Sequence, residues 1–249
     1  MRFADDELTY DAFLGGKLRL WQPRNGYRAA TDPVLLAAAC SARPDQSVLE
    51  LGCGVGTASL CLRSRVDVQI TGVEVQPAYA ELARRNAAEA GLKMEVLDSD
   101  LTSLPPDIRS RTFDHVIMNP PYYGPGMSSP NIGRDTALRE QTPLADWVDI
   151  ALRRAKPKGC VSVIHLAERL GDLIEMLNPR AGFIEIKPIA ARAGKPAKRV
   201  VIRAQKGRAS RSILYNPLVL HDGPEHRCDG DDYSHAARRI LRHGSSLEF

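Results

Sequence analysis

A short apolar segment that runs directly into a glycine-rich loop decides the fold of this chain: Ser47-Val48-Leu49-Glu50-Leu51-Gly52-Cys53-Gly54-Val55-Gly56-Thr57. A brief apolar run bounded by glycine is typical of a buried strand. A helical pattern follows through about Arg65, so the unit is a strand, a tight loop and a helix. Glycines in such a loop let the backbone pass close to a ligand, where a Cβ atom would clash. We therefore expect a parallel α/β sheet with a binding site where this strand ends.

Strand and helix patterns alternate from residue 47 to residue 177, and strands alone follow. Further apolar runs predict strands at 68–73, 94–98, 113–118, 160–165, 183–189, 199–203 and 213–220. Helical patterns occupy 77–90, 144–155 and 169–177. This order predicts an α/β fold with a doubly wound, mostly parallel seven-stranded sheet that ends in an antiparallel hairpin.

Residues 1–45 are expected to form a short extension that packs on the main domain, which we place at residues 46–249. Gly15-Gly16 lies between two short alternating segments, which is typical of a β-hairpin. Thr31-Asp32-Pro33 offers an N-cap and a first-turn proline for a helix from Val34 to about Cys40.

The composition excludes several classes of protein. Among 249 residues, 43% are hydrophobic and 26% are charged, as in an ordinary globular protein. No apolar run approaches the roughly 20 residues that span a bilayer, and the N-terminus lacks the apolar segment of a signal peptide. Five cysteines without a CxxC pair, and six scattered histidines, argue against a metal site. We expect a cytoplasmic protein with no bound metal.

The glycine loop favours one kind of ligand. Its spacing, Gly52, Gly54 and Gly56, differs from the GxGxxG that dinucleotide-binding proteins place over a pyrophosphate. Glu50 directly precedes the loop, and a carboxylate is unfavourable beside phosphates. Carboxylates suit a cationic or amine-bearing ligand, and S-adenosylmethionine carries both a sulfonium and an α-amino group.

Two further acids follow the next strands at the same edge of the predicted sheet. Glu74 ends the second strand, where a carboxylate can accept hydrogen bonds from ribose hydroxyls. Asp100 follows the third strand and could contact the amino group of adenine, with Leu101 or Val75 against the ring. These residues are therefore candidates for the nucleoside half of the same ligand.

The fourth strand ends in Asn119-Pro120-Pro121-Tyr122. Proline fixes its own φ and restricts the residue before it, so Asn119 and Pro120 are held extended. The Asn119 side-chain carbonyl and the Pro120 backbone carbonyl can then accept both hydrogens of one flat NH2 group. Tyr122 offers an aromatic face on which a base can stack. We predict Asn119, Pro120 and Tyr122 as catalytic residues, with Asn119 also beside the cofactor.

These features together resemble the class I S-adenosylmethionine-dependent methyltransferases over residues 47 to about 165. The glycine loop, the two acids and the Asn-Pro-Pro-Tyr motif occur in order, each at the carboxyl end of a strand. The resemblance implies a Rossmann-like sheet, S-adenosylmethionine as cofactor and S-adenosylhomocysteine as product. The tetrapeptide is similar to that of enzymes that methylate planar amide or exocyclic amine nitrogens.

The N-terminal stretch resembles a narrower family. Its residues are Gln22-Pro23-Arg24-Asn25-Gly26-Tyr27-Arg28 and then Thr31-Asp32-Pro33-Val34-Leu35-Leu36. They are similar to the bacterial tRNA1(Val) adenine-37 N6-methyltransferases, except at Pro33, where that family usually has Ala or Ser. The resemblance covers nearly the whole chain and implies methylation of an adenine next to the anticodon of a valine tRNA. It also implies that Gln22, Tyr27, Thr31 and Asp32 lie near the methionine end of the cofactor.

A basic stretch supports a nucleic-acid partner. From residue 180 to residue 211 there are ten Lys and Arg and one acid, Glu185. Clustered basic residues are the footprint of a phosphate-backbone partner. The candidate contacts with tRNA are Tyr122, Lys195, Lys198 and Arg199, together with Arg134 and Arg139 in the 120–142 segment, which we expect to be a mobile loop. The sequence indicates no membrane segment and no obligatory protein partner, and it leaves the oligomeric state open.

Other interpretations of the same motif stay open at this point. A protein glutamine N5-methyltransferase would present the same NH2 group, although such enzymes carry a larger helical N-terminal domain. Methylation of a base in ribosomal RNA or DNA would also fit the motif, and DNA methyltransferases usually need an additional target-recognition region. Outside enzymes, the chain could be a catalytically silent RNA-binding scaffold.

Overall fold

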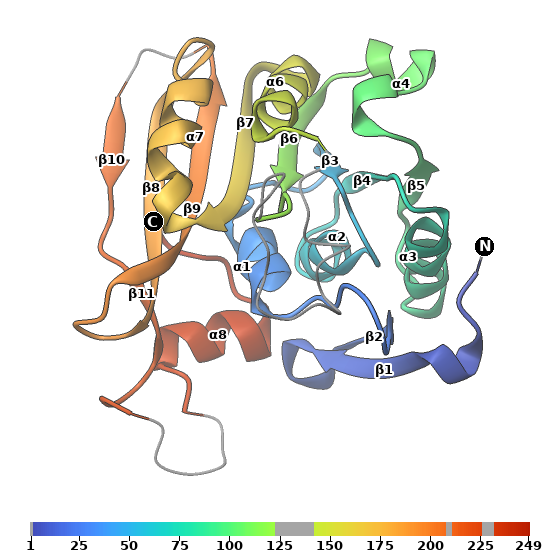
Figure 1. Cartoon of the computed structure of the whole chain (residues 1–249), viewed down its shortest axis with the longest axis horizontal. Coiled ribbons are helices and arrows are strands. Elements are labelled where there is room, and N and C mark those ends of the chain that lie inside the picture. Colours follow the sequence, from blue (N-terminus) through green and yellow to red (C-terminus); the bar gives the residue numbers. More distant parts are fainter. Residues whose placement is uncertain (1, 123–141, 208–210, 226–231) are drawn as a thin grey trace.

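A computed structural model of the 249-residue chain describes residues 2–122, 142–207, 211–225 and 232–249. It is built on one large sheet with helices on both faces (Figure 1). The strand order is β5-β4-β3-β6-β7-β9-β8-β10, and β11 also pairs with β8. The strands are β3 Ser47–Leu51, β4 Gln69–Glu74, β5 Glu95–Asp98, β6 Phe113–Met118, β7 Ala155–Leu166, β8 Ala181–Arg192, β9 Ala197–Lys206, β10 Ser212–Leu214 and β11 Leu218–His221.

The direction of the strands agrees with the sequence prediction. Parallel pairing joins β5, β4, β3, β6 and β7. Strand β9 runs antiparallel to both β7 and β8 and supplies the expected hairpin. The described sheet has nine strands rather than seven. Strands β3 to β9 account for seven of them. The other two, β10 and β11, both come from segment 213–220 at the outer edge, where each pairs in parallel with β8.

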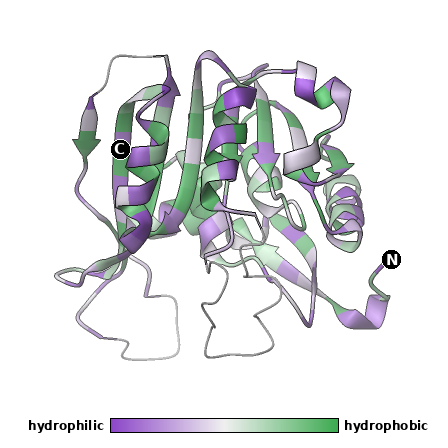
Figure 2. Ribbon diagram, turned by 45° about the horizontal axis from the view of Figure 1, so that its top comes forward, coloured by the Kyte–Doolittle hydropathy of each residue, from purple (hydrophilic) through white to green (hydrophobic). Residues whose placement is uncertain are grey.

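Helices cover both faces of the sheet because its strands bury alternate residues on opposite sides. Val48, Ile117 and Ile164 belong to a core shared with α1, α2 and α8. Their neighbours Leu49 and Val116 pack instead in a second core with α6 and α7. Figure 2 shows the hydrophobic residues concentrated along the strands. The helices are α1 Thr31–Ala39, α2 Thr57–Arg63, α3 Pro77–Glu89, α4 Pro106–Ser110, α6 Leu144–Arg154, α7 Leu170–Leu177 and α8 His235–His243, with 3-10 turns η1 Asp5–Glu7, η2 Leu14–Gly16, η3 Leu101–Ser103 and η4 Ala167–Arg169.

The predicted N-terminal hairpin is present as β1 Leu8–Phe13 and β2 Leu18–Pro23, with Phe13 opposite Leu18. The Asn86 side chain of α3 accepts from the Trp21 N–H at 2.7 Å and donates to the Trp21 carbonyl at 3.0 Å. At the hairpin tip, a Cβ on Gly15 would lie 2.7 Å from the Arg242 carbonyl of α8, so only glycine fits there. The hairpin is therefore fastened to elements from the middle and the end of the chain (Figure 1).

Helix α1 begins earlier than the sequence suggested. It starts at Thr31, so Ala30 rather than Thr31 is the N-cap, and no side chain caps the helix. Pro33 is tolerated as the third helical residue because the first N–H groups of a helix have no intrahelical partner. The predicted role of Thr31 as a cap is thus wrong, and its side chain is available for another purpose. Among the described helices, none is long and apolar enough to cross a membrane.

Candidate functional site

A cavity of about 780 Å³ lies at the carboxyl ends of β3, β4 and β6. Its volume falls within the roughly 300–1,000 Å³ of small-ligand sites, and its position is the switch point of the sheet, where ligands of open α/β folds bind. Fourteen predicted site residues line it: Tyr27, Thr31, Asp32, Glu50, Gly52, Gly54, Glu74, Val75, Asp100, Leu101, Asn119, Pro120, Tyr122 and Arg199. Residues of the N-terminal extension and Arg199 of β9 thus line the same cavity as the motifs between residues 50 and 122.

The glycine loop shapes the floor of the cavity. Gly52 and Gly54 have positive φ values of 66° and 55°. A Cβ on Gly52 would lie 2.5 Å from the Trp147 ring of α6, so the indole can pack here only against glycine. Gly56 also has a positive φ of 86°, but it is the N-cap of α2 and does not line the cavity. A Cβ on Gly56 would lie 3.5 Å from both Ala83 and Leu60, so this glycine shapes the turn before α2 and not the wall of the cavity.

Two buried carboxyl side chains fix the glycine loop and the helix that follows it through backbone N–H groups. Glu50 accepts hydrogen bonds from the N–H of Ser59, at 3.0 Å, and from the Ser59 hydroxyl. Burial raises the pKa of Glu50 to about 8, although the bonds from Ser59 oppose the shift. Glu74 accepts from the N–H groups of Gly54 and Gln76, both at 2.9 Å. Burial also raises the pKa of Glu74, and the backbone donors oppose that increase.

The remaining predicted contacts of the cofactor differ in their exposure. Val75 is 57% exposed at the mouth of the cavity, whereas Leu101 is buried. One Asp100 oxygen caps η3 by accepting from the Thr102 N–H at 2.7 Å and from its hydroxyl at 2.8 Å. Gln22 does not line the cavity. Its amide accepts from the Ala29 N–H and donates to Asp11, both at 2.7 Å, so it holds the loop before α1 from behind.

The Asn119-Pro-Pro-Tyr122 segment faces the loop before α1 and the start of that helix. Asn119 donates its side-chain N–H to the Tyr27 hydroxyl at 3.4 Å. The Tyr122 hydroxyl lies 3.1 Å from Asn119 Oδ1 and donates a short hydrogen bond to Asp32. Burial, and next the charge of Asp32, raise the pKa of both tyrosines, so both phenols stay protonated.

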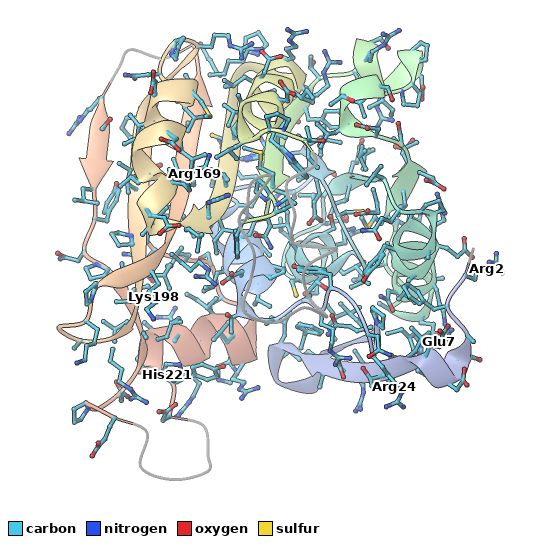
Figure 3. All side chains as sticks on the ribbon, in the orientation of Figure 1. Arg2, Glu7, Arg24, Arg169, Lys198 and His221 are labelled. Atoms are coloured by element: carbon cyan, nitrogen blue, oxygen red, sulfur yellow. The ribbon has the colours of Figure 1, made fainter. Side chains whose placement is uncertain are left out.

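The basic residues predicted to bind nucleic acid divide into two groups. Arg199 lines the cavity and forms an ion pair with Asp32, Nε to Oδ2 at 3.0 Å. Lys195 and Lys198 are exposed and lie outside the cavity wall. Lys198 belongs to β9 and lies on the hairpin of β8 and β9 (Figure 3). Arg134, Arg139 and most of the predicted 120–142 loop lie outside the described residues. The prediction that Arg199 contacts tRNA stays a prediction, and in this structure its guanidinium pairs with the Asp32 carboxylate.

Sequence analysis missed part of the cavity wall. Trp147 and Tyr79 line it, from α6 and α3 respectively. The Tyr79 hydroxyl accepts from the Tyr27 N–H at 2.9 Å and so fixes the loop over the glycine turn. Neither residue belongs to a recognisable motif, and only the close approach of Trp147 to Gly52 connects it with one.

Comparison with known proteins agrees with this geometry. A family model described as a methyltransferase domain matches residues 48–125. A solved structure from Agrobacterium tumefaciens, described as a predicted O-methyltransferase, superposes on the chain with a TM-score of 0.70 at 26% identity. That likeness covers 87% of this chain and 98% of the other. The expected Rossmann-like methyltransferase fold is therefore confirmed.

Relatives of the methyltransferase domain confirm the narrower resemblance. A Porphyromonas gingivalis protein named tRNA1(Val) (adenine(37)-N6)-methyltransferase is 33% identical over 159 residues, which are 59% of this chain and 61% of that protein. The match thus spans about three fifths of the relative's length. A protein of the same name from Actinobacillus succinogenes is 29% identical over 80% of this chain and 84% of its own. A Thermus thermophilus 16S rRNA N2 G1207 methyltransferase, solved with AdoMet and guanosine, shares the fold at 21% identity with a TM-score of 0.58, covering 80% of this chain and 50% of its own.

Proposed function

We propose that this protein uses S-adenosylmethionine to methylate N6 of an adenine in tRNA, namely the adenine next to the anticodon of a valine tRNA. One observation carries the proposal: Asn119, Pro120 and Tyr122 line the same cavity as Gly52 and Gly54. The acceptor motif and the cofactor loop thus face a common space. The names of the relatives support the choice of tRNA. We further propose a cytoplasmic enzyme in which residues 1–45 extend the domain formed by residues 46–249.

The residues of the cavity fit S-adenosylmethionine. The backbone of the glycine loop is open to a close approach, and the Asp32 carboxylate provides negative charge for a sulfonium or an amino group. Glu50 lines the same wall and offers a carboxyl oxygen that can accept a hydrogen bond from the amino group. Glu74 retains lone pairs for ribose hydroxyls, because its two carboxylate oxygens offer about four acceptor positions, more than the backbone N–H groups of Gly54, Val75 and Gln76 occupy. Val75 and Leu101 would hold the adenine ring of the cofactor, with the second oxygen of Asp100 near its amino group. When bound, the cofactor supplies an electrophilic methyl group and leaves as S-adenosylhomocysteine.

The acceptor side must orient a weak nucleophile, because the adenine N6 lone pair is delocalised into the ring. Asn119 Oδ1 and the Pro120 carbonyl would accept the two N–H groups and direct the lone pair toward the methyl group. The Tyr122 hydroxyl has a single proton, which it donates in the short hydrogen bond to Asp32. Asn119 Oδ1 therefore keeps its lone pairs for the substrate. Holding the reacting atoms in line supplies much of the rate enhancement.

The transfer balances without a strong base or a metal. The N6–methyl bond forms while the sulfur–methyl bond breaks, and the bonding pair returns to sulfur. The amine starts with two protons and ends with one, and the released proton passes to water. Tyr122 would stack on an adenine turned out of the anticodon loop.

The experiment that tests this function is transfer of labelled methyl from S-adenosylmethionine to unmodified bacterial tRNA, followed by nucleoside analysis. N6-methyladenosine beside the valine anticodon is the expected product, and the Asn119→Ala variant is the control. Labelling of ribosomal RNA or of a protein glutamine, with none in tRNA, would overturn the tRNA assignment. Absence of transfer to every one of these acceptors would favour a silent RNA-binding scaffold.

A further inference from the structure

Arg199 joins three segments that are far apart in the sequence. It lies on β9 opposite Leu166 of β7, and its side chain is 32% exposed. Its Nε donates to Asp32 Oδ2, at the start of α1, at 3.0 Å. The guanidinium carbon also lies 4.8 Å from the ring centroid of Tyr122. The same side chain therefore contacts both the N-terminal extension and the acceptor motif.

Tyr122 is held on three sides by residues from different elements. Its hydroxyl donates to the carboxylate oxygen that Arg199 also binds, Asp32 Oδ2. One face of its ring lies against the Arg199 guanidinium. The His165 ring of β7 meets it edge to face, with centroids 5.2 Å apart at 73°. These contacts fix both the tilt of the ring and the direction of the hydroxyl, while Tyr122 still lines the cavity.

Charge explains why an arginine suits this position. Asp32 is only 20% exposed at its side chain, so its carboxylate needs a partner in the cavity wall. Burial alone would lower the pKa of Arg199, but Asp32 and Tyr122 raise it above its usual value. The planar guanidinium can bind a carboxylate with one edge and stack on an aromatic face, which a lysine ammonium cannot do. Arg199 thus meets the needs of both neighbours at once.

We propose that Arg199 is a positioning residue: it holds Asp32, Asp32 holds the Tyr122 hydroxyl, and the acceptor platform is thereby set before any substrate arrives. This inference rests on the proposed function insofar as Tyr122 faces the acceptor base. Arg199 acts through Asp32 and Tyr122 rather than on the reacting atoms. It is assigned to the enzyme's own framework and not to the RNA-binding surface.

The same strand offers a matched control. Arg203 also lies on β9 and forms an ion pair with Glu185 at 2.7 Å. Its guanidinium lies 3.8 Å from the Phe249 ring centroid, so it too combines a carboxylate with an aromatic face. It does not line the cavity. Arg199→Gln and Arg203→Gln therefore remove the same chemical arrangement, near the acceptor motif in one case and away from it in the other.

The first measurement is hydrogen exchange of the segment that contains Asn119 and Tyr122, on the full chain without substrate. We expect Arg199→Gln to speed exchange of these amides roughly tenfold, because the local opening loses its side-chain tether. Arg203→Gln should leave this segment unchanged, and Arg199→Lys should lie between wild type and Arg199→Gln. Equal exchange in Arg199→Gln and wild type would overturn the proposal.

The second measurement is methyl transfer to tRNA with each variant. Arg199→Gln should lower kcat roughly 10- to 100-fold through misplacement of the platform, while affinity for S-adenosylhomocysteine, followed by tryptophan fluorescence, stays within about threefold. Normal kcat with weaker tRNA binding and a shallower salt dependence would make Arg199 a phosphate ligand and overturn the proposal. If the wild type methylates no tRNA while Arg199→Gln still speeds amide exchange, the proposed substrate is refuted and the positioning role stands.

Discussion

The cavity has two halves that are held in place by different kinds of contact. We call the wall with Gly52, Gly54 and Glu74 the cofactor half, and the wall with Asn119 and Tyr122 the acceptor half. In the cofactor half, Glu74 accepts from the backbone N–H of Gln76, two residues away, and of Gly54, 20 residues away in the loop after the neighbouring strand. In the acceptor half, Tyr122, Asp32 and Arg199 contact one another through their side chains, across sequence separations of 90 and 167 residues. Local backbone geometry fixes the first half, and long-range side-chain contacts fix the second.

Because of this difference, we expect substitutions in the two halves to reduce different properties of the protein. A substitution among the cofactor residues should disturb a loop whose shape depends on glycine and on backbone donors, and so should reduce cofactor affinity. A substitution in the acceptor half should leave that loop alone and misplace the acceptor, and so should reduce turnover. The following predictions either separate these two effects or show that the halves are coupled.

The largest effect is expected for Asn119→Ala. The variant loses an acceptor that orients the amine, so methyl transfer should fall by roughly 10²- to 10³-fold, the size of effect seen when one polar group is removed from a catalytic site. Affinity for S-adenosylhomocysteine, measured by calorimetry, should stay close to that of wild type. A parallel loss of cofactor affinity would show that Asn119 belongs to the cofactor half and would break the comparison.

Gly52→Ala should produce the opposite pattern. A Cβ at this position meets the Trp147 ring at 2.5 Å, and the positive φ strains any L side chain. The loop must shift to relieve this clash, and each 1.4 kcal/mol of binding free energy lost in the shift lowers affinity tenfold. We therefore expect cofactor affinity to fall by roughly tenfold or more. Gly171→Ala is the control, because no atom lies within 4 Å of its Cβ position in α7. Unchanged affinity in Gly52→Ala would contradict the role of the loop.

A moderate, pH-dependent effect is expected for Glu50. Its folded pKa of about 8 lies above the ordinary glutamate pKa of 4.5, so between these pH values the native state holds a proton that the unfolded chain has lost. Between these values the free energy of unfolding falls as the pH rises. Glu50→Gln should therefore raise Tm by a few degrees more at pH 8 than at pH 5. The exposed Glu168→Gln is the control, and an equal shift at both pH values in Glu50→Gln would refute the prediction.

The smallest effect is expected for the exposed lysines. Changing Lys195 and Lys198 together to alanine should weaken tRNA binding severalfold and reduce the salt slope by about one for each lost phosphate contact. Cofactor affinity and Asn119-dependent turnover at saturating tRNA should not change. Lys93→Ala, exposed just before β5, serves as control. Unchanged tRNA affinity in the double variant would remove this surface from the proposed interface.

The sequence could predict that the proposed cofactor residues lie together, because the signals that mark them are local. Glu50, Glu74 and Asp100 each sit at or just after the end of a strand, and parallel strands bring those ends to one edge of the sheet. Knowing the strand order was therefore enough to place all three at one cavity. Gln22 and Gly56 were also predicted to bind the cofactor. Neither lines the cavity, because Gln22 holds the loop before α1 and Gly56 is the N-cap of α2.

The acceptor half was only partly predictable. The Asn119-Pro-Pro-Tyr122 segment stands out in the sequence, but nothing near it specifies that Asp32 and Arg199 will meet Tyr122. Arg199 was assigned to a basic surface because charge patterns ignore long-range pairing. Trp147 escaped notice for a similar reason, since an apolar position on a helix does not reveal that it faces a glycine loop. Such contacts depend on how distant elements pack, which periodicity does not encode.

The division of the outermost strands affects how one molecule meets another. Strand β8 has twelve residues, and its outer side is occupied by β10 near its start and by β11 near its end. Pro217 lies between these two short strands and cannot donate a backbone hydrogen bond. A long free edge would invite strand addition from a neighbouring molecule, whereas short strands interrupted by proline offer a poor template. The arrangement that made the strand count differ from expectation thus also protects the sheet against edge-to-edge aggregation.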